Sequence, residues 1–144
     1  MKNELFFSSA SDNWSTPQDL FDFYDRIYHF TLDPASTDEN AKTEKHYTIS
    51  DNGLNHSWEG ETVWLNPPYG KEISQWLKKA YEEGQKENTI VVCLLPARTD
   101  TTWFHEYCTK GSIEFLRGRV KFSGQKNNAP FASMIVTFRR TYTR

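Results

Sequence analysis

Four consecutive residues, Asn66, Pro67, Pro68 and Tyr69, are the best suited to chemistry in this chain. Two prolines in a row have nearly fixed φ angles, so they hold the Asn66 side-chain carbonyl and the Pro67 backbone carbonyl in a defined relation. Two such acceptors can bind the two hydrogens of a planar amino group and turn its lone pair toward an electrophile. The Tyr69 ring can stack on a flat heterocycle. The alternative is a stiff turn between a strand and a helix, but the four residues together favour catalysis.

The tetrad resembles the catalytic motif of S-adenosylmethionine-dependent methyltransferases that act on adenine N6. The wider pattern resembles the phage-type, Dam-like DNA N6-adenine methyltransferase family, and it is more specific than the tetrad, which protein-glutamine and RNA methyltransferases share. The matching pieces run from about Trp14 to Phe138, over nearly the whole chain. They are residues 14–17, 32–35, 40–41, 58, 63–70, 95–101, 103–105, 117–122 and 129–131.

This resemblance implies a role for each part of the tetrad and for two other segments. Asn66 and Pro67 would hold the target amino group, Pro68 would stiffen the bend, and Tyr69 would stack on an extruded base. The cofactor, S-adenosylmethionine, would lie against residues 33–35, and residues 14–17 would close over its methionine part. The implied cofactor-binding residues are Trp14, Thr16, Pro17, Asp33, Pro34, Ala35 and Asn66. The turn at 33–37 lacks the glycine that many such enzymes carry there.

Cations gather in one connection near the C-terminal end of the chain. They are interleaved with Phe122 and with amide side chains, a composition that suits contacts to phosphates and base edges. Arg98 follows the end of a predicted strand and could reach the substrate or pair with Asp100. The predicted DNA-binding residues are Arg98, Arg117, Arg119, Lys121 and Lys126. The arginines of the C-terminal tail are interpreted as solvated charges.

Strand and helix patterns alternate along the chain. Helices are predicted from residue 17, from 73 and from 99, with Thr16 and Asp19 forming a capping box at the first. Strands are predicted at 29–32, 62–65, 89–95, 113–116 and 134–138. This order indicates an α/β protein with a mostly parallel sheet and helices on both faces, and the resemblance implies a compact Rossmann-like methyltransferase fold. The polar strand ends at 33–34, 66–67 and 96–97 would then face one crevice.

Length and composition limit the remaining choices. The chain has 144 residues and a formal net charge of -2, which excludes a uniformly basic nucleic-acid coat. We expect an N-terminal arm at 1–13 and a single methyltransferase domain at 14–144. No segment has the length and apolarity of a membrane span. His105 and Cys108 do not suffice for a metal site, so we expect no metal. The two cysteines do not make a disulfide framework, and we expect a reducing cytoplasm, that of a bacterial host.

Three classes of function stay open on the sequence. The first is a DNA adenine-N6 methyltransferase of phage or prophage origin, or the same chemistry on cytosine N4, RNA adenine or a glutamine side chain. The second is a nucleic-acid-binding module that has lost catalysis, and the third is an α/β interaction protein. Binding of S-adenosylmethionine separates the first two. DNA is the expected partner, and the oligomeric state is open, with a homodimer as one alternative.

Overall fold

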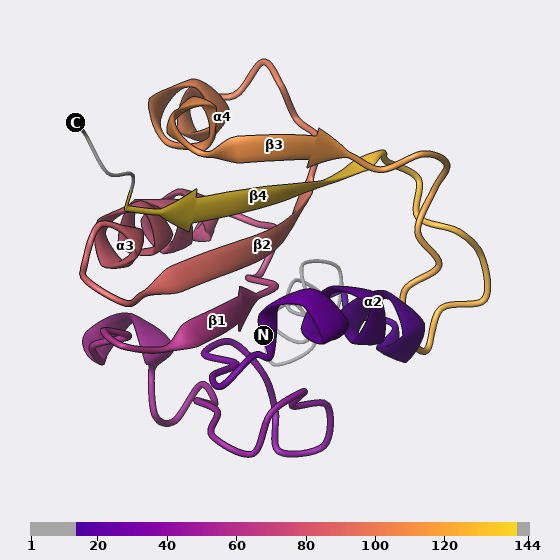
Figure 1. The fold of residues 1–144 in the computed structure, drawn as a ribbon. Helices are drawn as coiled ribbons and strands as arrows, with labels where there is room; N and C mark the ends of the chain where they lie inside the picture. Colours follow the sequence, from indigo (N-terminus) through magenta and orange to yellow (C-terminus); the bar gives the residue numbers. More distant parts are fainter. Residues whose placement is uncertain (1–13, 141–144) are drawn as a thin grey trace, which may run out of the picture.

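The computed structural model describes residues 14–140, so the arm expected at 1–13 and the last four residues lie outside the described chain. The described residues form a mixed α/β fold around a four-stranded sheet (Figure 1). The elements in chain order are α2 (Gln18–Tyr28), the 3-10 helix η1 (Gly53–Asn55), β1 (Thr62–Leu65), α3 (Ile73–Gly84), β2 (Ile90–Pro96), α4 (Thr102–Glu106), the 3-10 helix η2 (Cys108–Lys110), β3 (Ser112–Phe115) and β4 (Ser133–Arg139).

The sheet is mixed, and the mostly parallel arrangement that the sequence predicts is not confirmed by the pairing of the described strands. Its order is β1-β2-β4-β3. β1 pairs with β2 in parallel, whereas β4 runs antiparallel to both β2 and β3. The connection between β3 and β4 carries no helix. A parallel return to a neighbouring strand needs a crossover, usually helical, whereas an antiparallel return needs only a loop.

The strand predicted at 29–32 is reduced to isolated bridges. Leu32 pairs in parallel with Val63, and Asp33 pairs in parallel with His46. Pairing ends there because Pro34 has no N–H to donate. The segment still lies along β1, since the Trp64 N–H donates to the Leu32 carbonyl at 3.0 Å. Asp33 is therefore carried to the same end of the sheet as the residues that follow β1.

Helices cover both faces of the sheet, as the sequence predicts. On one face, α2 packs Phe21 and Tyr24 against Trp64, with ring centroids 5.6 and 6.1 Å apart. On the other face, α3 lies so close to β4 that a Cβ on Gly84 would be 2.7 Å from the Phe138 Cβ. In the sheet, Trp64 pairs with Val92 and Val92 pairs with Thr137, so these three side chains point to one face. Phe138 follows Thr137 on β4 and points to the other face, so α2 and α3 lie on opposite faces of the sheet.

The predicted capping box of the first helix is wrong. α2 begins at Gln18 with Pro17 as its N-cap residue and without a side-chain cap. The Thr16 hydroxyl is used elsewhere, because it accepts hydrogen bonds from Asn66 and Trp64. Within the described part of the chain, the Asp19 carboxylate accepts only from the adjacent N–H of Leu20. Between residues 14 and 140, no helix has both the length and the apolarity to cross a membrane.

Candidate active site

One cavity of about 620 Å³ collects most of the residues that the sequence singled out. This volume lies in the usual range for sites that bind small molecules and cofactors. The cavity is formed by four stretches of chain that are distant in sequence, and its lining residues are Trp14, Ser15, Thr16, Asp33, Pro34, Ala35, Ser36, Thr37, Asn40, Thr48, Ile49, Asn52, Gly53, Leu54, Asn66, Pro67, Pro68, Gly70, Lys71, Glu72 and Trp76. Two of the three strand ends expected to face one crevice, at 33–34 and 66–67, therefore line this cavity, whereas residues 96–97 do not.

The Asn66 amide is held in one orientation. Its Nδ2 donates to the Trp14 backbone carbonyl and to the Thr16 hydroxyl oxygen, the latter at 3.0 Å. Both amide hydrogens are thereby used, and Oδ1 is buried with no hydrogen-bond partner among the described residues. A flipped amide would set Oδ1 against the Trp14 carbonyl, and two acceptors cannot share a hydrogen. The network leaves a carbonyl oxygen free to accept.

Thr16 is the centre of this network. Its Oγ1 also accepts from the indole Nε1 of Trp64 at 3.1 Å, and an indole nitrogen can only donate. The lone pairs of the Thr16 oxygen are therefore directed at two fixed donors. Trp64 is fully buried in the sheet, so the hydroxyl that holds Asn66 is itself held by the core.

Asp33 brings a buried carboxyl group to the cavity wall. Its Oδ2 accepts from the backbone N–H of Lys42 at 2.9 Å. Burial raises the pKa of Asp33 from 3.8 to about 6, although the backbone N–H groups of Lys42 and Ala35 act in the opposite direction. A carboxylate that has lost most of its water is stabilised by further donors or by a cation. This wall is therefore suited to a ligand that carries a positive charge or hydroxyl groups.

A glycine from outside the first turn provides the close backbone approach at this wall. A Cβ on Gly53 would lie 2.1 Å from the Pro34 carbonyl oxygen, so no larger residue fits without a shift of the backbone. Gly53 is not among the cofactor-binding residues that the sequence predicts. The turn at 33–37 has no glycine, and the segment at 53 packs tightly against it instead.

Unpaired buried polar atoms are concentrated in the cavity lining. Four buried side-chain atoms in residues 14–140 have no hydrogen-bond partner, and those of Ser36, Asn66 and Trp76 belong to lining residues. Each such group costs about 1–3 kcal/mol unless something satisfies it. The sequence predicts neither Ser36 nor Trp76 as a site residue. An amphipathic helix with a buried indole looks the same whether the indole packs the core or contacts a ligand.

Tyr69 and Pro17 do not line the cavity. Tyr69 is 3% exposed, and its hydroxyl donates to the Leu94 carbonyl at 2.9 Å. Its ring lies edge-on to those of Phe122 and Phe131, at 6.3 and 5.8 Å. Trp14 contacts the same two phenylalanines at 5.5 and 5.2 Å. The residue expected to stack on a base is thus part of an aromatic cluster behind the bend.

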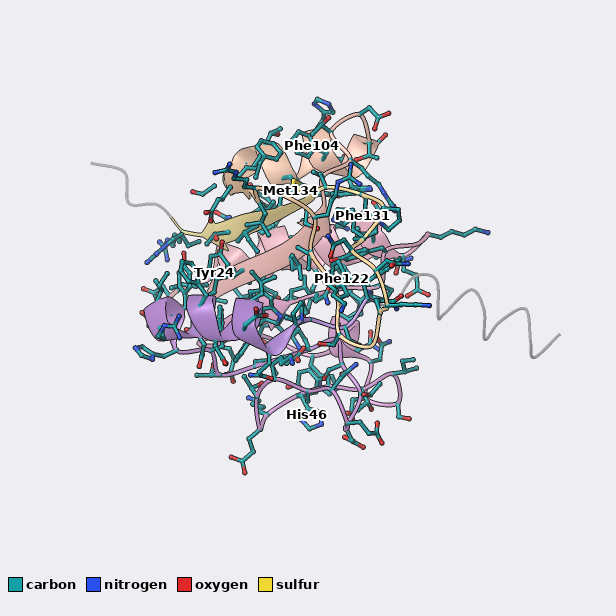
Figure 2. All side chains as sticks on the ribbon, turned by 90° about the vertical axis from the view of Figure 1, so that its right-hand side faces the viewer. Tyr24, His46, Phe104, Phe122, Phe131 and Met134 are labelled. Carbon is teal, nitrogen blue, oxygen red and sulfur yellow. The ribbon has the colours of Figure 1, made fainter. Side chains whose placement is uncertain are left out.

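The basic connection between β3 and β4, residues 116–132, lies against the strap 14–16. Figure 1 shows it leaving the end of the sheet and descending beside α2, and in Figure 2 Phe122 and Phe131 lie one above the other within it. The Ser123 N–H donates to the Ser15 carbonyl at 3.0 Å, and its hydroxyl donates to the Thr16 carbonyl at 3.2 Å. The loop is therefore attached to the segment that holds Asn66.

The predicted DNA-binding cations of this loop are exposed. None of them forms an ion pair with a residue in the described part of the chain, and they are Arg117, Arg119, Lys121 and Lys126. Arg98 is different, because its Nη1 donates to the Tyr69 carbonyl at 3.2 Å and its guanidinium lies over the Phe131 ring. It braces the bend, and no salt bridge joins it to Asp100 in the described structure.

The cysteines and histidines contribute no second site. Cys93 and Cys108 are buried free thiols, and burial raises the pKa of Cys108 to about 12. Among residues 14–140, no group of three or more His, Cys, Asp or Glu side chains could hold a metal ion. His46 lies at the far lower end of the view in Figure 2, where it pairs with Asp38 at 2.8 Å.

A fold with a cofactor-sized cavity and an Asn-Pro-Pro-Tyr bend at its wall is typical of amino methyltransferases. A family model described as DNA N-6-adenine-methyltransferase (Dam) matches residues 6–144. A DNA N-6-adenine-methyltransferase of Escherichia phage T1 is 39% identical over 100 residues, covering 68% of this chain and 41% of that protein. Another, from Haemophilus phage HP1, is 28% identical over 141 residues, covering 90% of this chain and 80% of its own. The chain belongs to the DNA N-6-adenine-methyltransferase (Dam) family.

The resemblance to solved structures is weaker. A Pyrococcus horikoshii protein described as a candidate RNA methyltransferase aligns with 69% of this chain and 52% of its own. The TM-score is 0.44 and the sequence identity 16%, so this similarity carries no argument about function.

Proposed function

We propose that this chain transfers a methyl group from S-adenosylmethionine to the exocyclic N6 of an adenine in DNA. The observation that carries the proposal is the Oδ1 of Asn66, which is buried with no hydrogen-bond partner among the described residues and is held by Trp14 and Thr16 in a cavity that Pro67 also lines. Family membership supports the same reaction. An amino group with two hydrogens is the donor that a pair of fixed acceptors selects.

The residues of the bend act by position. Asn66 Oδ1 and the Pro67 carbonyl oxygen each accept a hydrogen bond from one of the two N6 hydrogens, and this turns the nitrogen lone pair toward the cavity. Pro68 keeps the bend rigid. When bound, S-adenosylmethionine would supply the methyl group for N6 from its sulfonium, the sulfur would keep the electron pair of the broken bond, and N6 would release a proton to water. The two carbonyl dipoles also stabilise the positive charge that develops on N6. Fixed geometry of this kind can contribute roughly 7–11 kcal/mol.

The cofactor side of the cavity fits S-adenosylmethionine. Asp33 offers a desolvated carboxylate to a cationic ligand, and Pro34 and Ala35 continue the same wall. Trp14 and Thr16 close the side next to Asn66. Pro17 and Tyr69 act through support of the wall, Pro17 at the start of α2 and Tyr69 in the aromatic cluster.

The β3–β4 loop serves as the DNA contact. Its four cations are exposed and free of ion pairs with described residues, so they are available to phosphates. An adenine inside a duplex cannot reach a cavity and must be flipped out, at a cost of a few kcal/mol. The loop is attached to the strap beside Asn66, so the backbone it grips would lie next to the site. Arg98, which follows β2 and braces the bend through the Tyr69 carbonyl, is included as a further DNA contact.

We also assign the sheet to a small Rossmann-like methyltransferase fold within one domain at 14–144. The pairing makes β1, β2 and β3 point the same way, with only β4 reversed. The Leu32 segment then adds a short parallel strand beside β1. Cofactor and substrate would meet at the carboxyl ends of these strands.

The test is incubation of the chain with S-adenosylmethionine and unmethylated DNA, followed by mass spectrometry of the nucleosides. The expected product is N6-methyladenine, which is absent with Asn66→Ala. N4-methylcytosine, or methylation of RNA alone, would contradict the substrate. Cofactor binding without any methylated product would support an inactive binding module instead.

A further inference from the structure

Trp76 is a buried indole with an unused donor. It lies near the start of α3, is 6% exposed, and lines the cavity. Its Nε1 is shielded from water and has no hydrogen-bond partner in the described chain. An indole nitrogen can only donate, so an acceptor is what this position lacks.

The neighbouring indole shows how such a group is normally satisfied here. Trp58 is stacked on Trp76, with centroids 6.3 Å apart and planes at 21°. Trp58 Nε1 donates to the Gly53 carbonyl at 3.0 Å, and Trp64 Nε1 donates to Thr16. Packing alone therefore does not explain the free N–H of Trp76, because the indoles of Trp58 and Trp64, which are buried still more deeply in the same core, have partners.

Ser36 adds a second unpaired group to the same cavity. Its Oγ is buried and has no hydrogen-bond partner within residues 14–140, and it can donate or accept. Ile49, Gly53 and Leu54 also line this cavity and give it a partly apolar character. A flat, partly apolar ligand with several acceptor atoms matches this combination, and an adenine ring with its ribose has these properties.

We propose that the Trp76 Nε1–H and the Ser36 hydroxyl bind the adenosyl part of the cofactor. The inference rests on the proposed function and deepens it. Asn66 must lie near the transferred methyl group and is tied to residues 14–16, whereas Trp76 is tied through Trp58 to Gly53. The cofactor would thus extend from its sulfonium centre beside Asn66 to its adenosyl end beside Trp76.

The test uses Trp76→Phe and Ser36→Ala, with Trp103→Phe as the matched control. Trp103 is also buried, at 7% exposure, and does not line the cavity. Calorimetric titration measures the affinity for S-adenosylhomocysteine and for 5′-methylthioadenosine, which keeps the adenosyl group and lacks the amino acid. Each cavity variant should weaken both ligands by the same factor, about fivefold to tenfold, whereas Trp103→Phe should weaken neither.

Thermal unfolding without ligand provides a second readout. Trp76→Phe and the control Trp103→Phe lose the same ring atoms, but only Trp76→Phe also removes an unsatisfied donor, so its unliganded midpoint should be at least as high as that of the control. A midpoint below that of Trp103→Phe, with unchanged ligand affinity, would show a structural role and overturn the inference. A weaker affinity for S-adenosylhomocysteine with an unchanged affinity for 5′-methylthioadenosine would overturn the adenosyl assignment. If the unaltered chain bound neither ligand, the proposed function itself would fail.

Discussion

The cavity wall at Asn66 and the β3–β4 loop use polar groups in opposite ways. At the wall, each amide hydrogen of Asn66 has a fixed partner, and the Thr16 oxygen that holds it is held by buried Trp64. In the loop, the cations are exposed and their guanidinium and ammonium groups form no ion pairs with described residues. The wall holds a side-chain amide in a fixed orientation, and the loop presents exposed positive charges. Substitutions in the two regions should therefore change different kinetic quantities.

Asn66→Ala should have the largest effect. Loss of the acceptor should lower the rate constant of methyl transfer by at least about 100- to 1,000-fold, as is usual when one preorganised polar group is removed. The measurement is single-turnover transfer from labelled S-adenosylmethionine to DNA. Asn55→Ala, an exposed asparagine in η1 outside the cavity lining, is the control. A rate for Asn66→Ala within a factor of two of the control would refute the wall as the site of chemistry.

Asp33→Asn should change the dependence of stability on pH. Because the pKa of Asp33 is raised from 3.8 to about 6, the folded chain binds this proton more tightly than the unfolded chain does. The free energy of unfolding should therefore fall as the pH rises from about 4 to about 6, by on the order of 3 kcal/mol from this group. The variant should lack that fall and should bind S-adenosylmethionine more weakly. Urea unfolding at several pH values measures the free energy of unfolding. The same dependence on pH for the unaltered chain and for Asp33→Asn would contradict the raised pKa of Asp33.

Removing three loop cations together should weaken DNA binding and leave the chemical step intact. For Arg117→Ala, Arg119→Ala and Lys121→Ala combined, we expect a loss of DNA affinity of about 10- to 100-fold at moderate salt. The slope of the logarithm of the DNA-binding constant against the logarithm of salt concentration should fall in magnitude by about one for each phosphate that the variant no longer binds. Fluorescence anisotropy across a salt series measures both. Lys78→Ala with Lys110→Ala, on α3 and η2, is the control. An unchanged slope would place the DNA elsewhere.

Thr16→Val should have the smallest effect, and it tests the hydroxyl that connects Asn66 to the segment on which the β3–β4 loop packs. The valine keeps the shape and removes the oxygen that accepts from Asn66 and Trp64. We expect kcat to fall by about tenfold, with a smaller change in the KM for DNA, and Thr16→Ser should restore most of the loss. Thr89→Val is the matched control, because its buried hydroxyl is also paired, with Gly60 and Glu87, and does not line the cavity. Equal kcat for the two valine variants would remove Thr16 from the account.

Local signals in the sequence predicted the elements around the bend well. β1 at Thr62–Leu65 and α3 at Ile73–Gly84 match the predicted strand and helix, because prolines and helical periodicity fix their limits. The direction of β4 was not accessible in this way, since an apolar strand looks the same in either orientation. The same limit applies to Tyr69, because its place in the sequence does not show whether its ring faces a cavity or the core. Pairing and burial depend on the whole fold.

The most direct test of the central claim is a crystal structure of the chain with a non-reactive cofactor analogue and a DNA duplex containing adenine. The account predicts an extruded adenine whose N6 lies about 2.7–3.2 Å from Asn66 Oδ1, with the Thr16 and Trp14 contacts to Nδ2 retained. A bound adenine whose N6 contacts neither Asn66 Oδ1 nor the Pro67 carbonyl would contradict it.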